Sequence, residues 1–215
     1  MKEKIIKLWK NSRLFAFIDK CVSKYFQKKL KNDNFTILCP NCIGGHIYHR
    51  LGKQFLTPTI NMYQTQPDFV QFCLHLDEYL EQELSFFNSE NPYPTAHIGG
   101  VDGLPLLTLH FNHDSVAEEA RDKWERRKKR INRDNLYVIM YNLDGVTVEE
   151  IKQLENFKCN NKIVLSCKEL PEISWSLYIK PVMKYKYPYN YIGKDFLGIM
   201  HYEKKFDFIG FLNKK

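Results

Sequence analysis

The sequence predicts an α/β protein with a Rossmann-like fold, in which helices flank a mostly parallel sheet and an amphipathic helical arm precedes it. Short apolar runs alternate with stretches of helical periodicity, and turn-forming Pro, Asn and Gly residues separate the two. Positive charge is concentrated at the N-terminus, which distinguishes the arm from the rest of the chain. We therefore expect a basic arm over residues 1–31 and a single α/β domain over residues 32–215.

The charge of the arm indicates what it contacts. Residues 1–31 hold ten Lys or Arg and two acids, a net charge of +8, whereas the whole chain carries +7, so residues 32–215 sum to −1. Bulky apolar residues alternate with these cations, a composition that suits a helix lying on an anionic membrane surface. A helix packed on the body or on another subunit fits the same pattern. No nucleic-acid partner is expected, because such proteins usually carry basic residues across their folded face.

The distribution of apolar residues bears on where the protein resides. No apolar run approaches the roughly 20 residues that a helix needs to span a bilayer. The run Leu14–Ile18 is too short for the core of a signal peptide and lacks a cleavage site of small residues. We expect a cytoplasmic protein whose arm can lie at the inner face of the membrane. The six cysteines are then expected to be reduced thiols.

The first half of the domain contains two predicted strands and two predicted helices. Phe35–Cys39 is a short apolar run that ends at the turn-forming pair Pro40-Asn41, as a buried strand does. His46–Leu51 predicts a short helix, and Thr57–Tyr63 predicts a second strand. A helix is expected over Pro67–Leu84, because proline suits the first turn and apolar residues then recur every three or four positions.

A hairpin and a capped helix are expected next. Thr95–Ile98 and Leu104–Phe111 are predicted strands, and the glycines between them favour a hairpin. The pattern Ser115-Val-Ala-Glu118 is that of a capping box, in which side chains satisfy the first free amides of a helix. The helix that it opens is expected to run to about Ile131.

The last predicted elements complete the parallel sheet. Leu136–Tyr141 and Ile163–Cys167 are predicted to be buried strands, and a second capping box at Thr147–Glu150 opens a helix between them. From Ser174 onward the chain is rich in aromatic residues and poorly periodic, so no element is assigned there. Strands and helices that alternate at this spacing imply parallel strands joined by crossover helices.

The junction between the first strand and the following helix is the first candidate site. Ligands of parallel α/β proteins collect beyond the carboxyl ends of strands, where glycines allow a close approach and a helix N-terminus offers free N–H groups to an anion. This favours binding of an anionic substrate by Asn41, Cys42, Gly44, Gly45 and His46. A tight turn that serves only the fold is the alternative.

The spacing Cys39-x-x-Cys42 also suggests a metal site or a redox pair. Zinc needs about four ligands, and His46 and His49 could complete such a set only by folding back within one turn, so no metal is expected. A thiol–disulfide pair is the second interpretation, because a helix N-terminus can lower the pKa of a thiol. Two small residues in a tight turn are the third.

His113 and Asp114 form the second candidate site. They follow the predicted hairpin, and a histidine beside a carboxylate can act as a base whose tautomer the acid holds. Adjacent residues need not face each other, so two solvated loop residues are the alternative. Asp144, after the strand Leu136–Tyr141, could contact a sugar hydroxyl or simply form a turn. We take His113, Asp114 and Asp144 as candidate catalytic residues.

The helix over Ser115–Ile131 is the third candidate. At about 100° per residue, Trp124 and Arg127 fall on its inward stripe and Arg130 lies at the edge. An inward guanidinium needs an anion, which is either a buried carboxylate that joins helix to sheet or an anionic group of a ligand. The polar turn that follows this helix suits Asn and Asp and is readily explained as architecture.

Several motifs resemble those of a bacterial family of unknown function whose members are commonly described as exopolysaccharide or capsule biosynthesis proteins. They are Asn41-Cys42-x-Gly44-Gly45, Pro58-Thr59-Ile60-Asn61, Trp124-Glu-Arg-Arg-x-x-Arg130-Ile-Asn132-x-x-Asn135 and Phe206-Asp207-Phe208-x-x-Phe211-Leu212-Asn213. The resemblance covers residues 33–213 and leaves the arm outside. It implies an α/β, Rossmann-like fold and a place in surface-polysaccharide assembly, but it names no cofactor and transfers no catalytic residue. Further candidate substrate-binding residues are Asn61, Trp124, Arg127, Arg130, Asn132 and Asn135.

The leading functional hypothesis is a membrane-peripheral transferase that modifies or extends a bacterial surface polysaccharide. Its donor would be anionic, an acyl-CoA or a nucleotide sugar, held by the Gly44-Gly45 turn and by Arg127 or Arg130. His113 would deprotonate a sugar hydroxyl, oriented by Asp114 or Asp144. Acetyl transfer is favoured over glycosyl transfer, because no D-x-D metal pair is present.

A non-enzymatic glycan-binding or scaffold protein of the same assembly machinery is the alternative. In that case the aromatic residues near the C-terminus would stack on sugar rings. The two hypotheses differ in geometry, because an enzyme requires His113, Arg127 and the Gly44-Gly45 turn to converge on one site.

Overall fold

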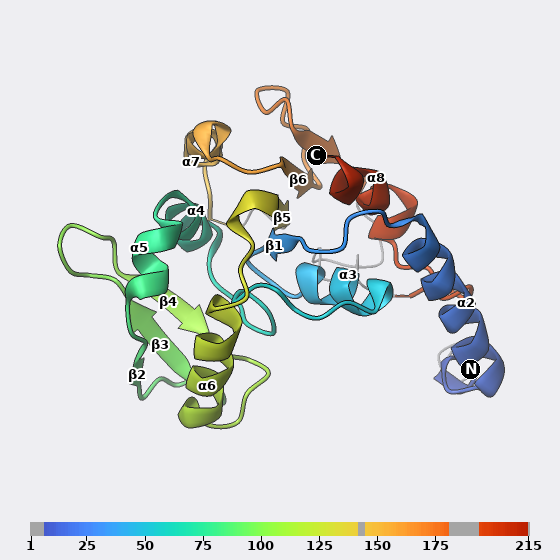
Figure 1. Ribbon diagram of the computed structural model, residues 1–215, viewed down its shortest axis with the longest axis horizontal. Coiled ribbons are helices and arrows are strands. Elements are labelled where there is room, and N and C mark those ends of the chain that lie inside the picture. Colours follow the sequence, from blue (N-terminus) through green and yellow to red (C-terminus); the bar gives the residue numbers. More distant parts are fainter. Residues whose placement is uncertain (1–6, 142–144, 181–193, 215) are drawn as a thin grey trace.

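The computed structural model describes residues 7–141, 145–180 and 194–214 and places a four-stranded sheet at the centre of the protein (Figure 1). The strands lie in the order β1 (Thr36–Leu38), β5 (Leu136–Tyr141), β6 (Asn161–Ser166) and β7 (Ser176–Tyr178), and every neighbouring pair is parallel. The α/β class and the mostly parallel sheet flanked by helices are therefore confirmed.

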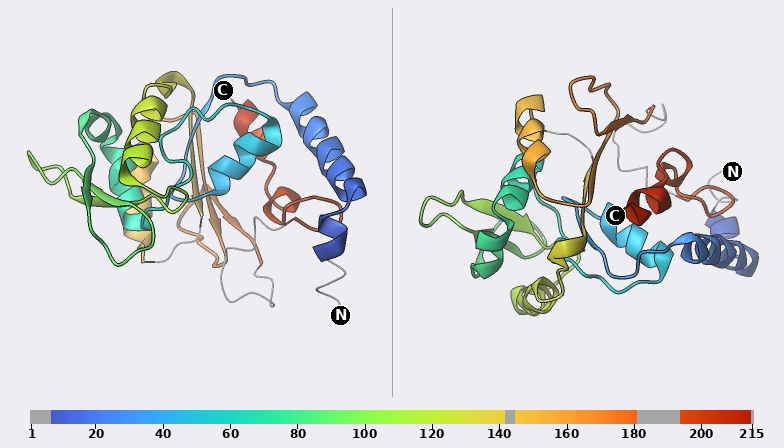
Figure 2. Two further views of the ribbon diagram at one scale, coloured as in Figure 1. Left: turned by 90° about the horizontal axis from the view of Figure 1, so that it is seen from below. Right: turned by 45° about the horizontal axis from the view of Figure 1, so that its top comes forward.

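Helices cover both faces of this sheet, as Figure 2 shows in its left view. The helices α4 (Gln66–Leu74), α5 (Leu76–Glu81), α6 (Ala117–Lys128) and α7 (Val148–Gln153) lie on one side, and α3 (Ile43–Leu51) and α8 (Phe208–Asn213) on the other. Alternate strand residues divide between the two cores: Val138 and Met140 face α4 and α6, whereas Tyr137 and Ile139 face α3 and α8. All of β5 is buried because parallel strands covered on both faces need apolar residues at every position.

A second, antiparallel sheet packs beside α4 and α6. It contains β2 (Ser85–Phe87), β3 (Thr95–Ile98) and β4 (Leu107–His110), with β3 in the middle. The predicted hairpin is confirmed as β3 and β4. The strand β2 was not predicted, since it is a three-residue edge strand with mostly exposed side chains and has no alternation of apolar and polar residues.

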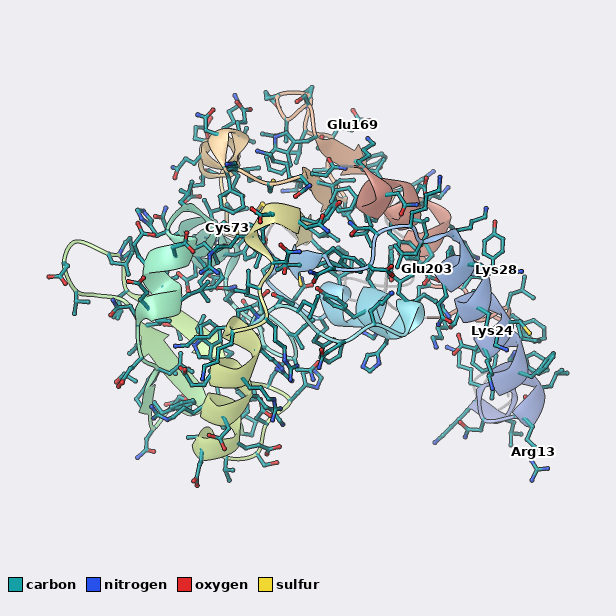
Figure 3. The ribbon with its side chains drawn as sticks, viewed as in Figure 1. Arg13, Lys24, Lys28, Cys73, Glu169 and Glu203 are labelled. Carbon is teal, nitrogen blue, oxygen red and sulfur yellow. The ribbon has the colours of Figure 1, made fainter. Side chains whose placement is uncertain are left out.

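The arm contains one long helix, α2 (Arg13–Lys29), which Ser12 caps by accepting a hydrogen bond from Phe15 N. It lies against α3 at the edge of the protein, with Phe26 packed on Phe208 at a ring distance of 4.8 Å. Arg13, Lys24 and Lys28 are spread along this helix (Figure 3). Within the described residues no helix has both the length and the apolar character needed to cross a bilayer.

Three local predictions are wrong and one is confirmed. Thr57–Tyr63 is a bent segment in which only Tyr63 makes an isolated bridge, because Pro58 lacks an N–H and Asn61 has a left-handed φ of 56°. The predicted helix after Pro67 is interrupted between α4 and α5. Helix α6 has no side-chain cap, so the first capping box does not form, whereas the second, at Thr147, does. Short 3-10 turns lie at Arg133–Asn135, Leu154–Asn156 and Tyr202–Lys204.

Candidate functional site

The carboxyl end of β1 meets the segment after β4 at the centre of the candidate site. Tyr63 pairs through its backbone with His110, with both N–O distances at 2.8 Å, and Gln64 donates its N–H to the Pro40 carbonyl over 3.0 Å. This short bridge ties the end of the hairpin to the loop after β1. It therefore places the loop after β4 beside the loop after β1, although the two are distant in sequence.

Cys42 and His113 meet where these two loops adjoin. The Cys42 Sγ atom lies 3.3 Å from His113 Nε2. His113 is exposed, whereas Cys42 is half-buried as the residue that precedes α3. Burial raises the pKa of the Cys42 thiol, which favours the protonated sulfur. A thiol in contact with an imidazole can form a nucleophile and its base.

Cys39, the other cysteine of the C-x-x-C pattern, is fully buried beneath α3. Its thiol donates to the Asn41 carbonyl over 3.1 Å, and burial raises the pKa of Cys39 to about 12. No disulfide joins Cys39 to Cys42. Within the described ranges no group of three or more His, Cys, Asp or Glu side chains is placed to hold a metal ion. Of the two cysteines, Cys42 is therefore the one available for chemistry.

Asn41 fixes the loop that carries Cys42. Its Nδ2 donates to the carbonyl of Tyr141, the last residue of β5, over 3.1 Å, and its Oδ1 accepts from Ile43 N over 3.2 Å. Gln66 donates to the same Tyr141 carbonyl over 2.9 Å. Side-chain amides thus join the ends of β1, β5 and the start of α4, and Asn41 Oδ1 satisfies the first backbone N–H of α3. Nothing in the sequence indicated Gln66, because an isolated glutamine at the start of a helix carries no signal.

Gly44 and Gly45 let α3 pack closely on the end of the sheet. A Cβ atom on Gly44 would lie 2.6 Å from Cys39 Sγ, which is shorter than any real contact. A Cβ atom on Gly45 would lie 3.6 Å from Ile60 Cδ1 and 3.7 Å from Asn61 Oδ1, which are ordinary contact distances. Asn61 is therefore next to the glycine turn, in a left-handed conformation that asparagine tolerates.

These two glycines predict opposite results in one experiment. Gly44→Ala should lower the free energy of unfolding by about 1–3 kcal/mol, because the added methyl group overpacks the buried Cys39. Gly45→Ala should leave it unchanged or raise it by up to about 1 kcal/mol, since alanine favours a helix. Urea unfolding measures both, and Gly44→Ala combined with Cys39→Ala should recover most of the loss. Equal effects of the two single changes would contradict the packing described here.

A cavity of about 580 Å³ opens between α2 and α3 and shares His46 with this site. Its polar and charged lining includes Lys10, Asp19, His46, His49, Arg50 and Lys194. Burial lowers the pKa of His46, and nearby positive groups that include Lys194 and His113 lower it further. His46 is thus close to both the cavity and the Cys42–His113 contact. The sequence placed His46 here but gave no indication of Lys194, which comes from the far end of the chain.

The structure does not pair His113 with Asp114. The Asp114 side chain is buried, and its Oδ1 accepts a hydrogen bond from Lys123 Nζ over 2.5 Å. The carboxylate therefore faces α6, while the neighbouring imidazole faces Cys42. Asp114 cannot hold the tautomer of His113 in this arrangement, and its direct contact is with the helix that carries Arg127.

Arg127 is buried on the inward face of α6, as predicted, but it forms no ion pair with any residue that the structure describes. Its guanidinium donates to the Ile60 carbonyl over 2.9 Å and lies 5.9 Å from the centre of the Phe55 ring. Among the described residues no carboxylate lies within 4.0 Å of it. Burial lowers the pKa of Arg127, and the charge of Asp114 opposes that shift. Arg127 therefore holds the bent segment that places Asn61 beside Gly45.

The remaining predicted residues lie elsewhere. Trp124 is buried in the core against Phe72, and Arg130 is half-buried just beyond α6. Asn132 and Asn135 both donate to the Asn34 carbonyl, at 2.8 and 2.7 Å, which places them at the amino ends of β1 and β5, opposite the candidate site. Their expected role in substrate binding at that site is not supported by this position. Asp144 lies outside the described residues.

Comparisons with known proteins identify relatives but no activity. The family described as "Domain of unknown function (DUF1919)" matches residues 14–213. An "Uncharacterized protein" of Haemophilus influenzae is 32% identical over 197 residues, which cover 89% of this chain and 90% of that protein. The family match begins within α2, so most of this helix belongs to the matched region. The motif resemblance described from the sequence, by contrast, covers residues 33–213 and leaves the arm outside.

Proposed function

The chain belongs to the DUF1919 family, and we propose that it is a transferase that moves an acyl group onto a hydroxyl of a bacterial surface polysaccharide or its precursor. The observation that carries the proposal is the 3.3 Å contact between Cys42 Sγ and His113 Nε2 beyond the carboxyl end of β1. The polysaccharide acceptor rests on the resemblance of four motifs to proteins described as acting in exopolysaccharide or capsule synthesis.

The proposed reaction proceeds through a thioester on Cys42. His113 Nε2 takes the thiol proton, and the thiolate attacks the carbonyl carbon of an acyl-thioester donor such as an acyl-CoA. The donor thiol leaves and takes the proton from His113. The acceptor hydroxyl then gives its proton to His113 and attacks the Cys42 thioester, so that an ester forms and Cys42 leaves as the thiolate. His113 returns the proton to Cys42 and completes the cycle.

The surroundings of the pair support an anionic donor. The cavity that shares His46 is lined by three basic groups, of which Arg50 is bound to Asp19 and Glu203 and Lys194 is bound to Asp19. Lys10 is the third, and among the described residues no carboxylate lies within 4.0 Å of it. A phosphate group of an acyl-CoA or of a nucleotide sugar would fit this cavity beside Lys10, with the reacting carbon beyond His46 at Cys42. This assignment replaces Arg127 as the donor contact, because Arg127 is committed to the Ile60 carbonyl.

Intact-mass measurement after incubation with short acyl-CoAs tests the proposal. We expect one acyl adduct on the wild-type protein, removed by hydroxylamine as a thioester is, and none on Cys42→Ala. His113→Ala should slow its formation about 10²–10⁴-fold, the usual contribution of a positioned base. Cys21→Ser is the matched control, since Cys21 is an exposed thiol on α2. Its removal should change nothing.

Two outcomes would contradict the thioester mechanism. One is the absence of an adduct on the wild-type protein with every acyl-CoA tried, and the other is an adduct that forms equally fast without His113. If Cys42→Ala keeps transfer activity in cells while His113→Ala loses it, the base acts directly on the acceptor hydroxyl, as in glycosyl transfer. If neither change affects the glycan, a non-enzymatic role in its assembly is favoured.

A further inference from the structure

The outer side of α2, together with the residues next to it, exposes a row of large apolar side chains. Each of them is more than half exposed: Leu8, Leu14, Phe17, Tyr25, Phe196 and Leu197. Phe196 joins this surface because its ring stacks on Trp9 at 4.3 Å, and its carbonyl accepts a hydrogen bond from Trp9 Nε1 over 3.0 Å. We call this surface the arm face. Solvent-exposed apolar side chains gathered on one side of a helix indicate a partner.

The apolar residues of α2 are divided between two opposite sides of the helix. Phe15 and Phe26 point inward, the first buried and the second packed on Phe208. Leu14 and Phe17 point outward and contribute nothing to that packing, since both are exposed. Attachment of the arm to the body therefore accounts for Phe15 and Phe26 but not for Leu14 and Phe17. These outward residues need a separate explanation.

The charges of the arm face are all of one sign within residues 7–31. All eight basic side chains of this segment are exposed: Lys7, Lys10, Arg13, Lys20, Lys24, Lys28, Lys29 and Lys31. The only acid of the segment, Asp19, is turned inward, where it pairs with Arg50 at 2.7 Å and with Lys194 at 2.6 Å. Among the described residues, none of the eight basic groups lies within 4.0 Å of a carboxylate. Lys10 also lines the cavity between α2 and α3, and the other seven basic residues make the arm face cationic as well as apolar.

We propose that the arm face docks on the anionic surface of a lipid bilayer. Leu14, Phe17 and Tyr25 enter the boundary between head groups and acyl chains, and the lysines beside them contact lipid phosphates. A duplex nucleic acid would satisfy the charges but would offer no place for the apolar side chains. A second copy of the chain would bury the apolar side chains but would bring two cationic helices together.

Docking through this face would fix the orientation of the whole protein. Helix α2 is held to α3 by Asp19 and Arg50, and the residues that precede α2 are held by the Trp9–Phe196 stack. The cavity between α2 and α3 lies on the inner side of the same helix. The arm therefore acts as a rigid support and not as a loose tether.

Co-sedimentation with vesicles tests the charge component. The wild-type protein should bind vesicles of phosphatidylcholine mixed with phosphatidylglycerol, lose most of this binding in high salt, and bind pure phosphatidylcholine weakly. Each basic residue near an anionic leaflet strengthens binding about fivefold, so Lys20→Gln, Lys24→Gln and Lys28→Gln together should weaken it roughly 100-fold. The matched control replaces three exposed lysines outside the arm: Lys129→Gln, Lys158→Gln and Lys168→Gln. This control variant should retain at least one-third of the wild-type affinity for the anionic vesicles.

Replacement of the apolar residues tests the other component. Leu14→Ser with Phe17→Ser should weaken vesicle binding about tenfold or more without altering the unfolding curve, because both residues are exposed. The control is Leu106→Ser with Val101→Ser, since Leu106 is 56% exposed, as Leu14 is, but lies on the hairpin loop at the other end of the protein. The proposal is overturned if wild-type protein does not bind anionic vesicles at low salt or if control and test variants lose binding equally. The proposal is also overturned if the arm variants lose binding to duplex nucleic acid, or lose dimerisation, while their vesicle binding equals that of the control variants.

Discussion

Arg50→Met should lower the free energy of unfolding by about 3–5 kcal/mol, the loss expected when one partner of a buried ion pair is removed. The Arg50 side chain is only 1% exposed, and it contacts the fully buried side chain of Glu203 at 2.6 and 2.9 Å. The same group donates to Asp19 over 2.7 Å and to the Gly198 carbonyl over 2.6 Å. Its removal leaves a carboxylate in the core without a cation, so urea unfolding should begin at much lower denaturant concentration.

Lys53→Gln is the matched control for this change. Lys53 lies three residues after Arg50 and pairs with Asp33, but Asp33 is 83% exposed, so this pair should contribute no more than about 1 kcal/mol. Adding Glu203→Gln to Arg50→Met should restore part of the loss, because the buried charge is then gone. The interpretation is wrong if Arg50→Met and Lys53→Gln have the same effect on the unfolding curve.

Trp124→Ala should lower the free energy of unfolding by a similar amount, about 3–5 kcal/mol. Trp124 is 1% exposed and packs edge-on against Phe72 at a ring distance of 6.1 Å. Trp124→Phe should cost much less, because it keeps an aromatic ring, and the indole N–H makes no hydrogen bond among the described residues. Thermal or urea unfolding of both variants measures the difference.

The result also decides between two roles for Trp124, which the sequence placed among the substrate-binding residues. A core residue loses stability in proportion to the volume removed, whereas a binding residue loses activity without a change in stability. Arg126→Ala is the control, since Arg126 is exposed on the same helix and should change stability by no more than about 0.5 kcal/mol. A Trp124→Ala variant that is stable but lacks activity would show that Trp124 belongs to the substrate-binding site.

The sheet and its helices could be predicted because local patterns report them directly. β5 and β6 were found from apolar runs bounded by turn residues, and the capping box at Thr147 was found from its spacing. Local sequence patterns gave wrong predictions where a side chain, and not the backbone of a neighbouring strand, forms the hydrogen bond. Over Thr57–Tyr63 the β-branched residues suggest a strand. However, the Thr59 hydroxyl accepts a hydrogen bond from the Cys39 N–H, which is then not available to pair with the backbone of a neighbouring strand. Likewise Ser115 has capping-box spacing, yet α6 starts after Val116 without its help.

The candidate site could be predicted only in part. Its first half, Asn41 to His46, follows a strand and precedes a helix, which is a local signal. The contact of Cys42 with His113 crosses 71 residues, and no periodicity links the two. Asp114 illustrates the limit most clearly, since its neighbour in sequence suggested a catalytic pair, but burial directs it to Lys123 instead. The cavity required Lys194, from a region where no element could be assigned.

The amino-acid sequence by itself determined the parallel sheet buried on both faces, the strand-to-helix turn that opens the site, and the concentration of positive charge in the arm. These properties depend on residues close together in the chain, so periodicity and composition reveal them. Only the tertiary structure decided that Cys42 meets His113, that Arg127 donates to the Ile60 carbonyl, and that Asp19 turns inward while Leu14 and Phe17 remain outside. Such pairings depend on the path of the chain between distant segments, and burial and charge neutralisation select them only when those segments come together.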